Sequence, residues 1–204
     1  MKKHFLIIVI CCSFLLWVSF DMGILKRLFG ERSLLKAQAA EQTDSKKKNP
    51  QETYTGLRNL ALTAKASDFF KVGLIGKHGV YGVLMEMGLP EGNVTLATFI
   101  TGDVSLYFST GGGMLGGIGY EKVSNAAIEF NKKADEFVPQ SKKTTVFPSP
   151  SVGKTIFYIL TKDGIYTVQE SDDVLESGES NFTALANAGH NVLTEFRIAA
   201  EKNK

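Results

Sequence analysis

The residues most able to do chemistry gather in a glycine-rich run between residues 109 and 119, which reads STGGGMLGGIG. Gly111, Gly113 and Gly116 match the G-x-G-x-x-G spacing, after a predicted strand and before a predicted helix. Backbone amides at the start of a helix can hold an anion, so the run predicts contact with a phosphate or another small ligand. The candidate ligand-binding residues are Ser109, Thr110, Gly111, Gly112, Gly113, Gly116 and His190.

Dinucleotide binding fits this run poorly. That motif belongs to a strand–helix–strand crossover, whereas the preceding strand here is the third of a predicted meander. Glu136, about twenty residues beyond, falls within a predicted helix and cannot serve as the ribose-binding acid. The simpler interpretation is that the glycines allow close backbone packing or form a flexible flap.

Two further patterns suggest nucleophilic or metal chemistry only weakly. Ser151 and Lys154 match S-x-x-K, but a strand follows them and the partner motifs are missing. A serine hydrolase that combines Ser109 or Ser151 with His190 is therefore the third hypothesis for function. No spacing of histidine, cysteine or carboxylate residues predicts a metal site, and no cofactor is expected.

An apolar segment at the amino terminus predicts attachment to a membrane. Residues 5–20 carry no charge, and residues 5–25, counted as one helix, would be about 31 Å long, enough to span a bilayer. The alternative is a secretory signal that is cleaved near Ala39. The expected location is the cell membrane, crossed once, with the globular domain outside the cytoplasm.

The charge distribution supports this division of the chain. Residues 1–52 carry nine basic and five acidic side chains, which leaves 14 basic and 16 acidic ones in the remainder. A faintly acidic body lacks the positive surface that nucleic-acid binding requires, so nucleic acid is not an expected partner. We therefore divide the chain into an anchor or signal (1–25), a juxtamembrane segment and polar linker (26–52), and a globular domain (53–204).

Periodicity within the globular domain predicts alternating groups of helices and strands. Apolar residues recur at helical spacing near residues 57–66, 120–137 and 182–196, and Ser180 is a plausible cap for the last helix. Five strand-like runs cover residues 80–87, 94–101, 104–110, 155–161 and 165–170. Asp163-Gly164 gives the strongest hairpin signal.

These elements predict an α+β domain with three helices and a largely antiparallel, five-stranded sheet, in the order α-β-β-β-α-β-β-α. A transmembrane helix would precede it. The layout is similar to that of profilin-like or roadblock-like domains, and such a likeness does not fix function.

Four segments carry a resemblance to a group of uncharacterised bacterial hypothetical proteins. They read YGVLMEMG (81–88), SLYFSTGGGMLGG (105–117), FYILTKDGIYTVQES (157–171) and NAGHNVLTEFR (187–197). The resemblance covers roughly residues 57–198 and implies no assigned activity and no catalytic residues.

The leading hypothesis is a membrane-tethered, non-enzymatic interaction or sensory domain, because a complete small fold lacks a recognisable catalytic constellation. Its expected partners are the membrane, through residues 5–25, and another protein or a second copy of the chain. The alternative is a small-ligand or phosphate-binding module that uses the loop from Gly111 to Gly119.

Overall fold

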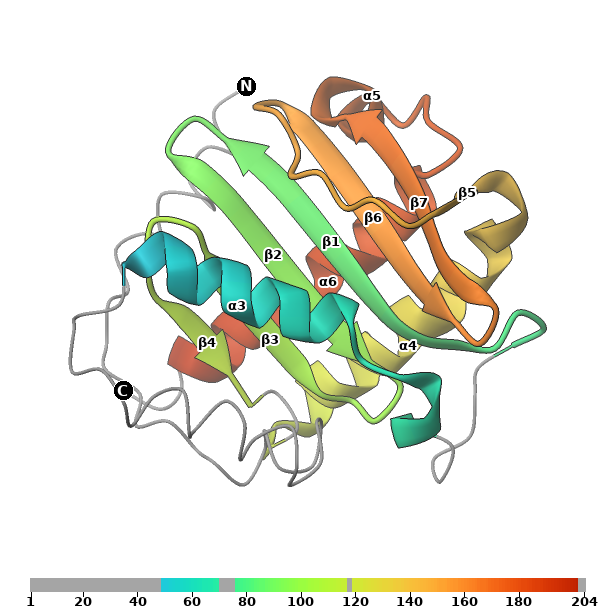
Figure 1. Cartoon of the computed structure of the whole chain (residues 1–204), viewed down its shortest axis with the longest axis horizontal. Coiled ribbons are helices and arrows are strands. Elements are labelled where there is room, and N and C mark those ends of the chain that lie inside the picture. Colours follow the sequence, from blue (N-terminus) through green and yellow to red (C-terminus); the bar gives the residue numbers. More distant parts are fainter. Residues whose placement is uncertain (1–48, 70–75, 117–118, 202–204) are drawn as a thin grey trace.

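The computed structural model describes residues 49–69, 76–116 and 119–201. Its centre is a seven-stranded sheet with the order β4-β3-β2-β1-β6-β7-β5, in which every neighbouring pair is antiparallel (Figure 1). The strands are β1 (Val80–Leu89), β2 (Gly92–Phe99), β3 (Val104–Phe108), β4 (Gly113–Leu115), β5 (Lys142–Thr144), β6 (Lys154–Thr161) and β7 (Gly164–Ser171).

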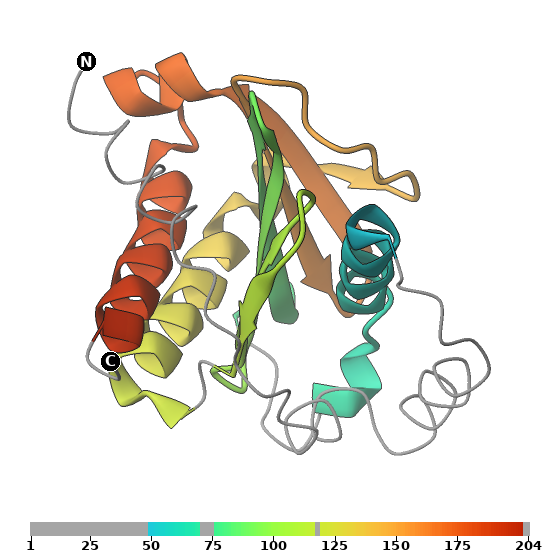
Figure 2. The same ribbon diagram turned by 90° about the vertical axis from the view of Figure 1, so that its left-hand side faces the viewer.

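Helices cover both faces of this sheet. Helices α4 (Glu121–Phe137) and α6 (Thr183–Glu201) pack side by side on one face, and α3 (Pro50–Leu62) lies on the other (Figure 2). Below, these are called the α4/α6 face and the α3 face. The short elements are α5 (Asp172–Ser177) and the 3-10 turns η1 (Ala66–Phe69) and η3 (Val138–Gln140).

Alternation along the strands divides the core into two layers. In β6, Phe157 and Ile159 point to the α4/α6 face, whereas Ile156, Tyr158 and Leu160 point to the α3 face. Successive side chains of a strand point to opposite faces, so an apolar run such as TIFYILT is buried on both sides. The central strands β1 and β6 are therefore fixed between two helical layers.

Close packing on the α4/α6 face depends on one glycine. A Cβ atom at Gly189 of α6 would lie 2.6 Å from Met85 Sδ and 3.1 Å from Phe130 Cζ. Only a residue without a side chain lets the helix approach the sheet so closely. Helix α6 therefore lies against β1 and α4 at this point.

The α+β class is confirmed, but the expectation of five strands and three helices is wrong. Within the described residues the sheet has seven strands, because Gly113–Leu115 pairs with β3 and Lys142–Thr144 pairs with β7. Four α-helices are present there, since Asp172–Ser177 forms the short helix α5 in addition to the three expected helices. The expected profilin-like or roadblock-like layout therefore does not describe this sheet, which is extended by a short strand at each edge.

The added elements are too short and too polar to show a periodic pattern. Strand β4 has three residues in a glycine-rich run, and β5 contains two lysines and a threonine. Neither composition favours a strand, so pairing with β3 and β7 must hold these residues extended. The tertiary structure decides their conformation.

The predicted transmembrane helix, over residues 5–25, lies outside the described residues. In residues 49–69, 76–116 and 119–201, no helix combines the length and the apolar character needed to cross a bilayer. Helix α3 begins at Pro50, where the Asn49 side chain accepts a hydrogen bond from the Gln51 N–H. The first described helix thus starts inside the segment that the sequence assigned to the linker.

Candidate functional site

Residues 145–153 cross the α3 face of the sheet between β5 and β6, and we call this segment the strap (Figure 1). The middle of the strap is fixed to β6, because the Tyr158 hydroxyl donates to the Pro148 carbonyl at 2.5 Å. Its end is held by the Gly153 N–H, which donates to the Gly88 carbonyl at 2.9 Å. The strap is thus tied to the two central strands, β6 and β1.

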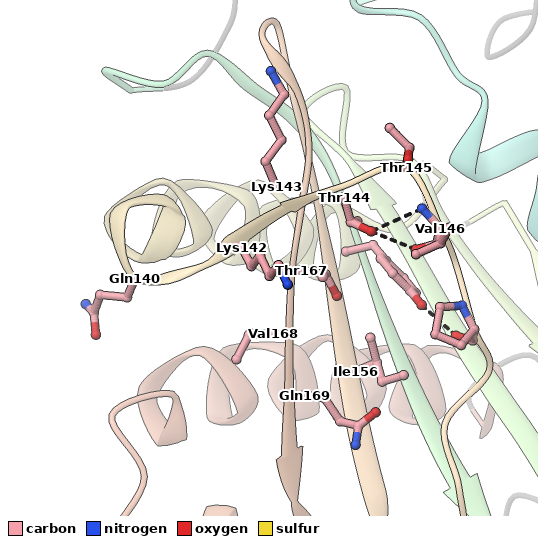
Figure 3. Close-up of a pocket in the computed structure, with 12 residues that line it drawn as sticks. Gln140, Lys142, Lys143, Thr144, Thr145, Val146, Ile156, Thr167, Val168 and Gln169 are labelled. Atoms are coloured by element: carbon pink, nitrogen blue, oxygen red, sulfur yellow. Dashed lines mark hydrogen bonds between the residues drawn. The ribbon is translucent and has the colours of Figure 1, made fainter.

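A groove of about 630 Å³ opens between the strap and the strands β6 and β7 (Figure 3). Its apolar lining residues are Val146, Pro148, Ile156, Tyr158 and Val168. Its polar lining residues are Gln140, Lys142, Lys143, Thr144, Thr145, Thr167 and Gln169. An apolar floor with polar groups around it is the usual composition of a binding site.

The lining of the groove contains basic residues and no acidic one. Lys142 and Lys143 lie at its edge, and none of the twelve lining residues is acidic. Both lysines are exposed, and neither belongs to any of the ion pairs found in the described part of the chain. Lys142 pairs with Thr167, whereas Lys143 pairs with Tyr166 and therefore points to the α4/α6 face, beside Gly164. An anionic group in the groove would therefore meet one solvated cation, Lys142.

The strap also exposes apolar side chains. The large hydrophobic residues that are exposed within the described ranges are Tyr120, Val146 and Val152, and both valines belong to the strap. Val146, which is 69% exposed, lines the groove, whereas Val152, which is 63% exposed, does not. An exposed apolar side chain beside an apolar groove is a feature of interaction surfaces.

A buried ion pair connects α3 to both the sheet and the strap. Arg58 donates from Nε to Glu86 Oε1 at 2.6 Å and from Nη2 to Glu86 Oε2 at 2.8 Å. The same Nη2 donates to the carbonyls of Phe147 and Pro148 at 2.9 and 3.2 Å. Because Glu86 has no exposed surface, this two-bond contact fixes α3 and the strap relative to β1.

The polar atoms around this ion pair are satisfied by a short chain of hydroxyl groups. Thr95 Oγ1 donates to Glu86 Oε1 at 3.2 Å, and it also bonds to the Tyr54 hydroxyl of α3 at 2.8 Å. The guanidinium carbon of Arg58 lies 5.7 Å from the centre of the Tyr158 ring. A fully satisfied buried network rigidifies its surroundings.

Burial governs the proton affinities in this region. It raises the pKa of Glu86, and the hydrogen bonds from Arg58 and Thr95 oppose that rise. Burial, together with the nearby Glu86 charge, raises the pKa of Tyr158 to about 12. Tyr158 therefore stays protonated at neutral pH and keeps donating to the strap.

The predicted glycine site forms a hairpin between β3 and β4. The N–H of Ser109 donates to the Asn93 carbonyl at 2.9 Å, and its Oγ accepts from the Asn93 N–H at 2.8 Å. Gly111 and Gly112 turn the chain with positive φ, Gly113 pairs with Tyr107, and Gly116 follows β4. Thr110 lies exposed in the same turn.

This hairpin is separated from the following helix by β4. The N–H groups of a helix amino terminus are first available at Glu121, and the preceding residue, Tyr120, supplies no capping side chain. Gly111 lies beside the first residue of α3, since a Cβ atom at Gly111 would be 3.1 Å from Pro50. Ligand binding by this hairpin stays a prediction, and its close packing against α3 is observed.

His190 lies far from this hairpin. It is exposed on α6 and lies close to Asp172, whose pKa is raised by burial, and the charge of His190 opposes part of that rise. Asp172 follows β7, and Ser109 follows β3, four strand spacings away, or roughly 19 Å at ~4.8 Å per spacing. The structure thus does not bring Ser109 and His190 together.

No metal site is apparent in the described ranges, where no group of three or more His, Cys, Asp or Glu side chains is suitably arranged. The residues that build the groove and fix the strap are not among the candidate residues predicted from the sequence. Arg58 and Glu86 carried the only usable signal, since each is a single charge within an apolar segment. Two such charges on neighbouring elements can be matched as a buried pair. Lys142, Lys143 and Val146 lie in a polar stretch without periodicity, and nothing in the sequence distinguishes them.

Comparison with protein-family models, with curated proteins and with solved structures finds no match to this chain.

Proposed function

We propose that this chain is a membrane-tethered, non-enzymatic interaction domain and that the groove beside the strap is where it captures a segment of a partner protein. The observation that carries the proposal is the composition of the groove. An apolar floor, an exposed valine on its wall and a polar, cationic edge suit the side chains and backbone of a bound peptide.

The fixed position of the strap supports binding without large rearrangement. Pro148 accepts hydrogen bonds from Tyr158 and Arg58, so one wall of the groove is held by buried groups. A binding site that is already formed loses little conformational entropy when its ligand arrives. The groove is therefore suited to capture a mobile segment, and most of the conformational entropy lost on binding would be that of the segment.

The tether places this groove near a membrane. Residues 5–25 would form the anchor, and α3 begins at Pro50, so a short linker would join the membrane to the domain. Partners confined to the same membrane would meet the groove at a raised effective concentration. Weak binding to a short segment would then suffice for function.

Selection from a library of random 12-residue peptides displayed on phage tests the proposal. The target is the full chain, purified in detergent so that residues 5–25 stay in solution. We expect peptides that bind the full chain and lose at least tenfold in affinity when Val146 is replaced by Asp. The matched control is Val152→Asp, because Val152 has similar exposure on the same strap but does not line the groove.

Failure to select any binder, or binders with equal affinity for both variants, would refute a role for the groove. Peptides that bind elsewhere on the chain would also have equal affinity for both variants, since neither valine substitution would affect their site. A substrate turned over by the chain would contradict the non-enzymatic part of the proposal.

A further inference from the structure

We infer that the groove takes an extended, acidic peptide segment of a partner protein, which adds as a strand to the open outer edge of β7. This inference rests on the proposed function and specifies the chemistry of the partner. It follows from the register at the sheet edge and from the charge of the groove.

Strand β5 covers only part of the outer edge of β7. It pairs with Ile165, Tyr166 and Thr167, and no strand in the described part of the chain pairs with residues 168–171 on that side. An uncovered strand edge offers N–H and C=O groups to an added strand. Strand addition at this edge would continue the line of β5 along the groove.

The direction of each backbone group in β7 follows from hydrogen bonds at its end. The N–H of Asp172 donates inward to the Gly153 carbonyl at 3.1 Å, whereas the N–H of Ser171 is taken by the Glu170 side chain at 2.9 Å. Because these directions alternate along an antiparallel strand, odd-numbered residues of β7 face outward. Gln169, which is exposed and lines the groove, therefore presents its N–H and C=O to solvent.

The charge of the side chains next to the open edge of β7 determines which peptides bind there. Lys142 pairs with Thr167, the last residue of β7 that β5 covers, so Lys142 lies next to the open part of the edge. Lys143 pairs with Tyr166 and points to the α4/α6 face, so Lys142 is the cation on the side of the groove, and the groove lining contains no acid that would compete for it. A peptide carrying Asp or Glu would gain attraction to Lys142, and a basic peptide would be repelled.

The apolar residues of the groove determine which side chains the bound segment carries between its acidic ones. Ile156 and Tyr158 line the groove from the α3 face of β6, and Val146 lines it from the strap. Side chains of an added strand alternate between two directions, so every second residue would face these apolar groups. The segment that fits best is extended, with apolar or β-branched residues alternating with acidic ones.

Two substitutions at one position separate strand addition from ordinary side-chain contact. Gln169→Pro removes the outward N–H and leaves the inward bonds of β7 to β6, whereas Gln169→Ala keeps the N–H and removes the side chain. With peptides selected on the full chain, we expect Gln169→Pro to weaken binding roughly threefold to tenfold. Gln169→Ala should change the affinity by less than about twofold. Equal effects of the two substitutions would overturn strand addition.

Charge reversal provides a second test that does not depend on how well the proline variant folds. Replacing Lys142 by Glu should weaken acidic peptides at least threefold in low salt, with a smaller effect at 0.5 M salt. Lys122→Glu, at an exposed position of α4 on the opposite face, should leave binding unchanged. Selected peptides without enrichment in Asp and Glu, or with equal affinity for the reversed variant, would overturn the inference.

The possible failures are distinguishable. Peptides that depend on Val146 but have no acidic preference and ignore Gln169→Pro would leave the proposed function intact and reject this inference. A library that yields no binder would reject both. Self-association through this edge, seen as a dimer that Gln169→Pro and Lys142→Glu abolish, would assign it to a second copy and overturn the inference.

Discussion

Replacing Arg58 by Met removes the partner of a carboxylate that has no contact with solvent. Glu86 is 0% exposed and receives two hydrogen bonds from Arg58, at 2.6 and 2.8 Å. Breaking a buried ion pair by removing one partner costs about 3–5 kcal/mol, because the remaining charge stays desolvated. We therefore expect Arg58→Met to lower the free energy of unfolding by about that amount, which is a large share of the 5–15 kcal/mol typical of domains.

The assay is urea unfolding of the full chain, compared with two reference variants. The exposed pair Lys132–Glu129, with an N–O distance of 2.7 Å, is the matched control, and Lys132→Met should cost less than about 1 kcal/mol. The double variant Arg58→Met with Glu86→Leu removes both charges, so it should be more stable than Arg58→Met alone.

The pH dependence gives an independent check with a definite sign. Burial already raises the pKa of Glu86 above its ordinary value of 4.5, and loss of Arg58 removes the groups that oppose the rise. An acid with a raised pKa in the folded state contributes stability below its unfolded pKa and loses that contribution as the pH rises. The deficit of Arg58→Met should therefore be smaller at pH 4 than at pH 8. A deficit below 1 kcal/mol, or one independent of pH, would refute the reasoning.

Three further predictions concern other parts of the fold. Gly189→Ala should destabilise by about 1 kcal/mol, since its Cβ would lie 2.6 Å from Met85 Sδ, whereas Gly56→Ala in α3, with nothing within 4 Å, should stabilise by about 0.5–1 kcal/mol. Asp172→Asn should raise the melting temperature at pH 7 and have little effect near pH 3. Burial raises the pKa of Asp172, so the folded protein loses stability as this carboxyl ionises with rising pH, and asparagine does not ionise. In an absorbance titration of the native chain, Tyr107 and Tyr158 should ionise near pH 12, and Tyr158→Phe should remove one of the two.

Each of these predictions has an outcome that contradicts it. Equal effects at the two glycines would mean that α6 does not approach β1 as closely as the structure indicates. If the stability difference between Asp172→Asn and the wild type is the same at both pH values, the burial of that carboxyl is contradicted. Ionisation of all tyrosines near pH 10 would contradict the burial of Tyr107 and Tyr158.

The sequence predicts the long elements of this fold because their patterns are strong. Helix α4 was expected over residues 120–137 and is found at Glu121–Phe137, and the hairpin at Asp163-Gly164 joins β6 to β7. A helix of this length repeats its apolar face several times, and a two-residue turn has a distinctive composition. Such signals are local, so the sequence alone is enough to show them.

The candidate site could not be predicted in the same way. The strap has no regular secondary structure, and its position depends on hydrogen bonds to Arg58 and Tyr158 that span 89 or 90 and 10 residues of sequence. Strand β5 is held by β7, and its two lysines look like an ordinary solvated pair when read from the sequence. The composition of the glycine run predicts ligand binding, whereas the structure shows it turning β3 into β4 and packing Gly111 against α3.

Hydrogen exchange of the full chain, with and without a saturating selected peptide, tests most directly whether the groove is the binding site. We expect slower exchange of backbone amides in residues 140–148 and 165–170, which line the groove and the edge of β7. Exchange in the β3–β4 hairpin should not change. Protection confined to residues 109–116 or to α6, with the groove unaffected, would contradict the proposed site.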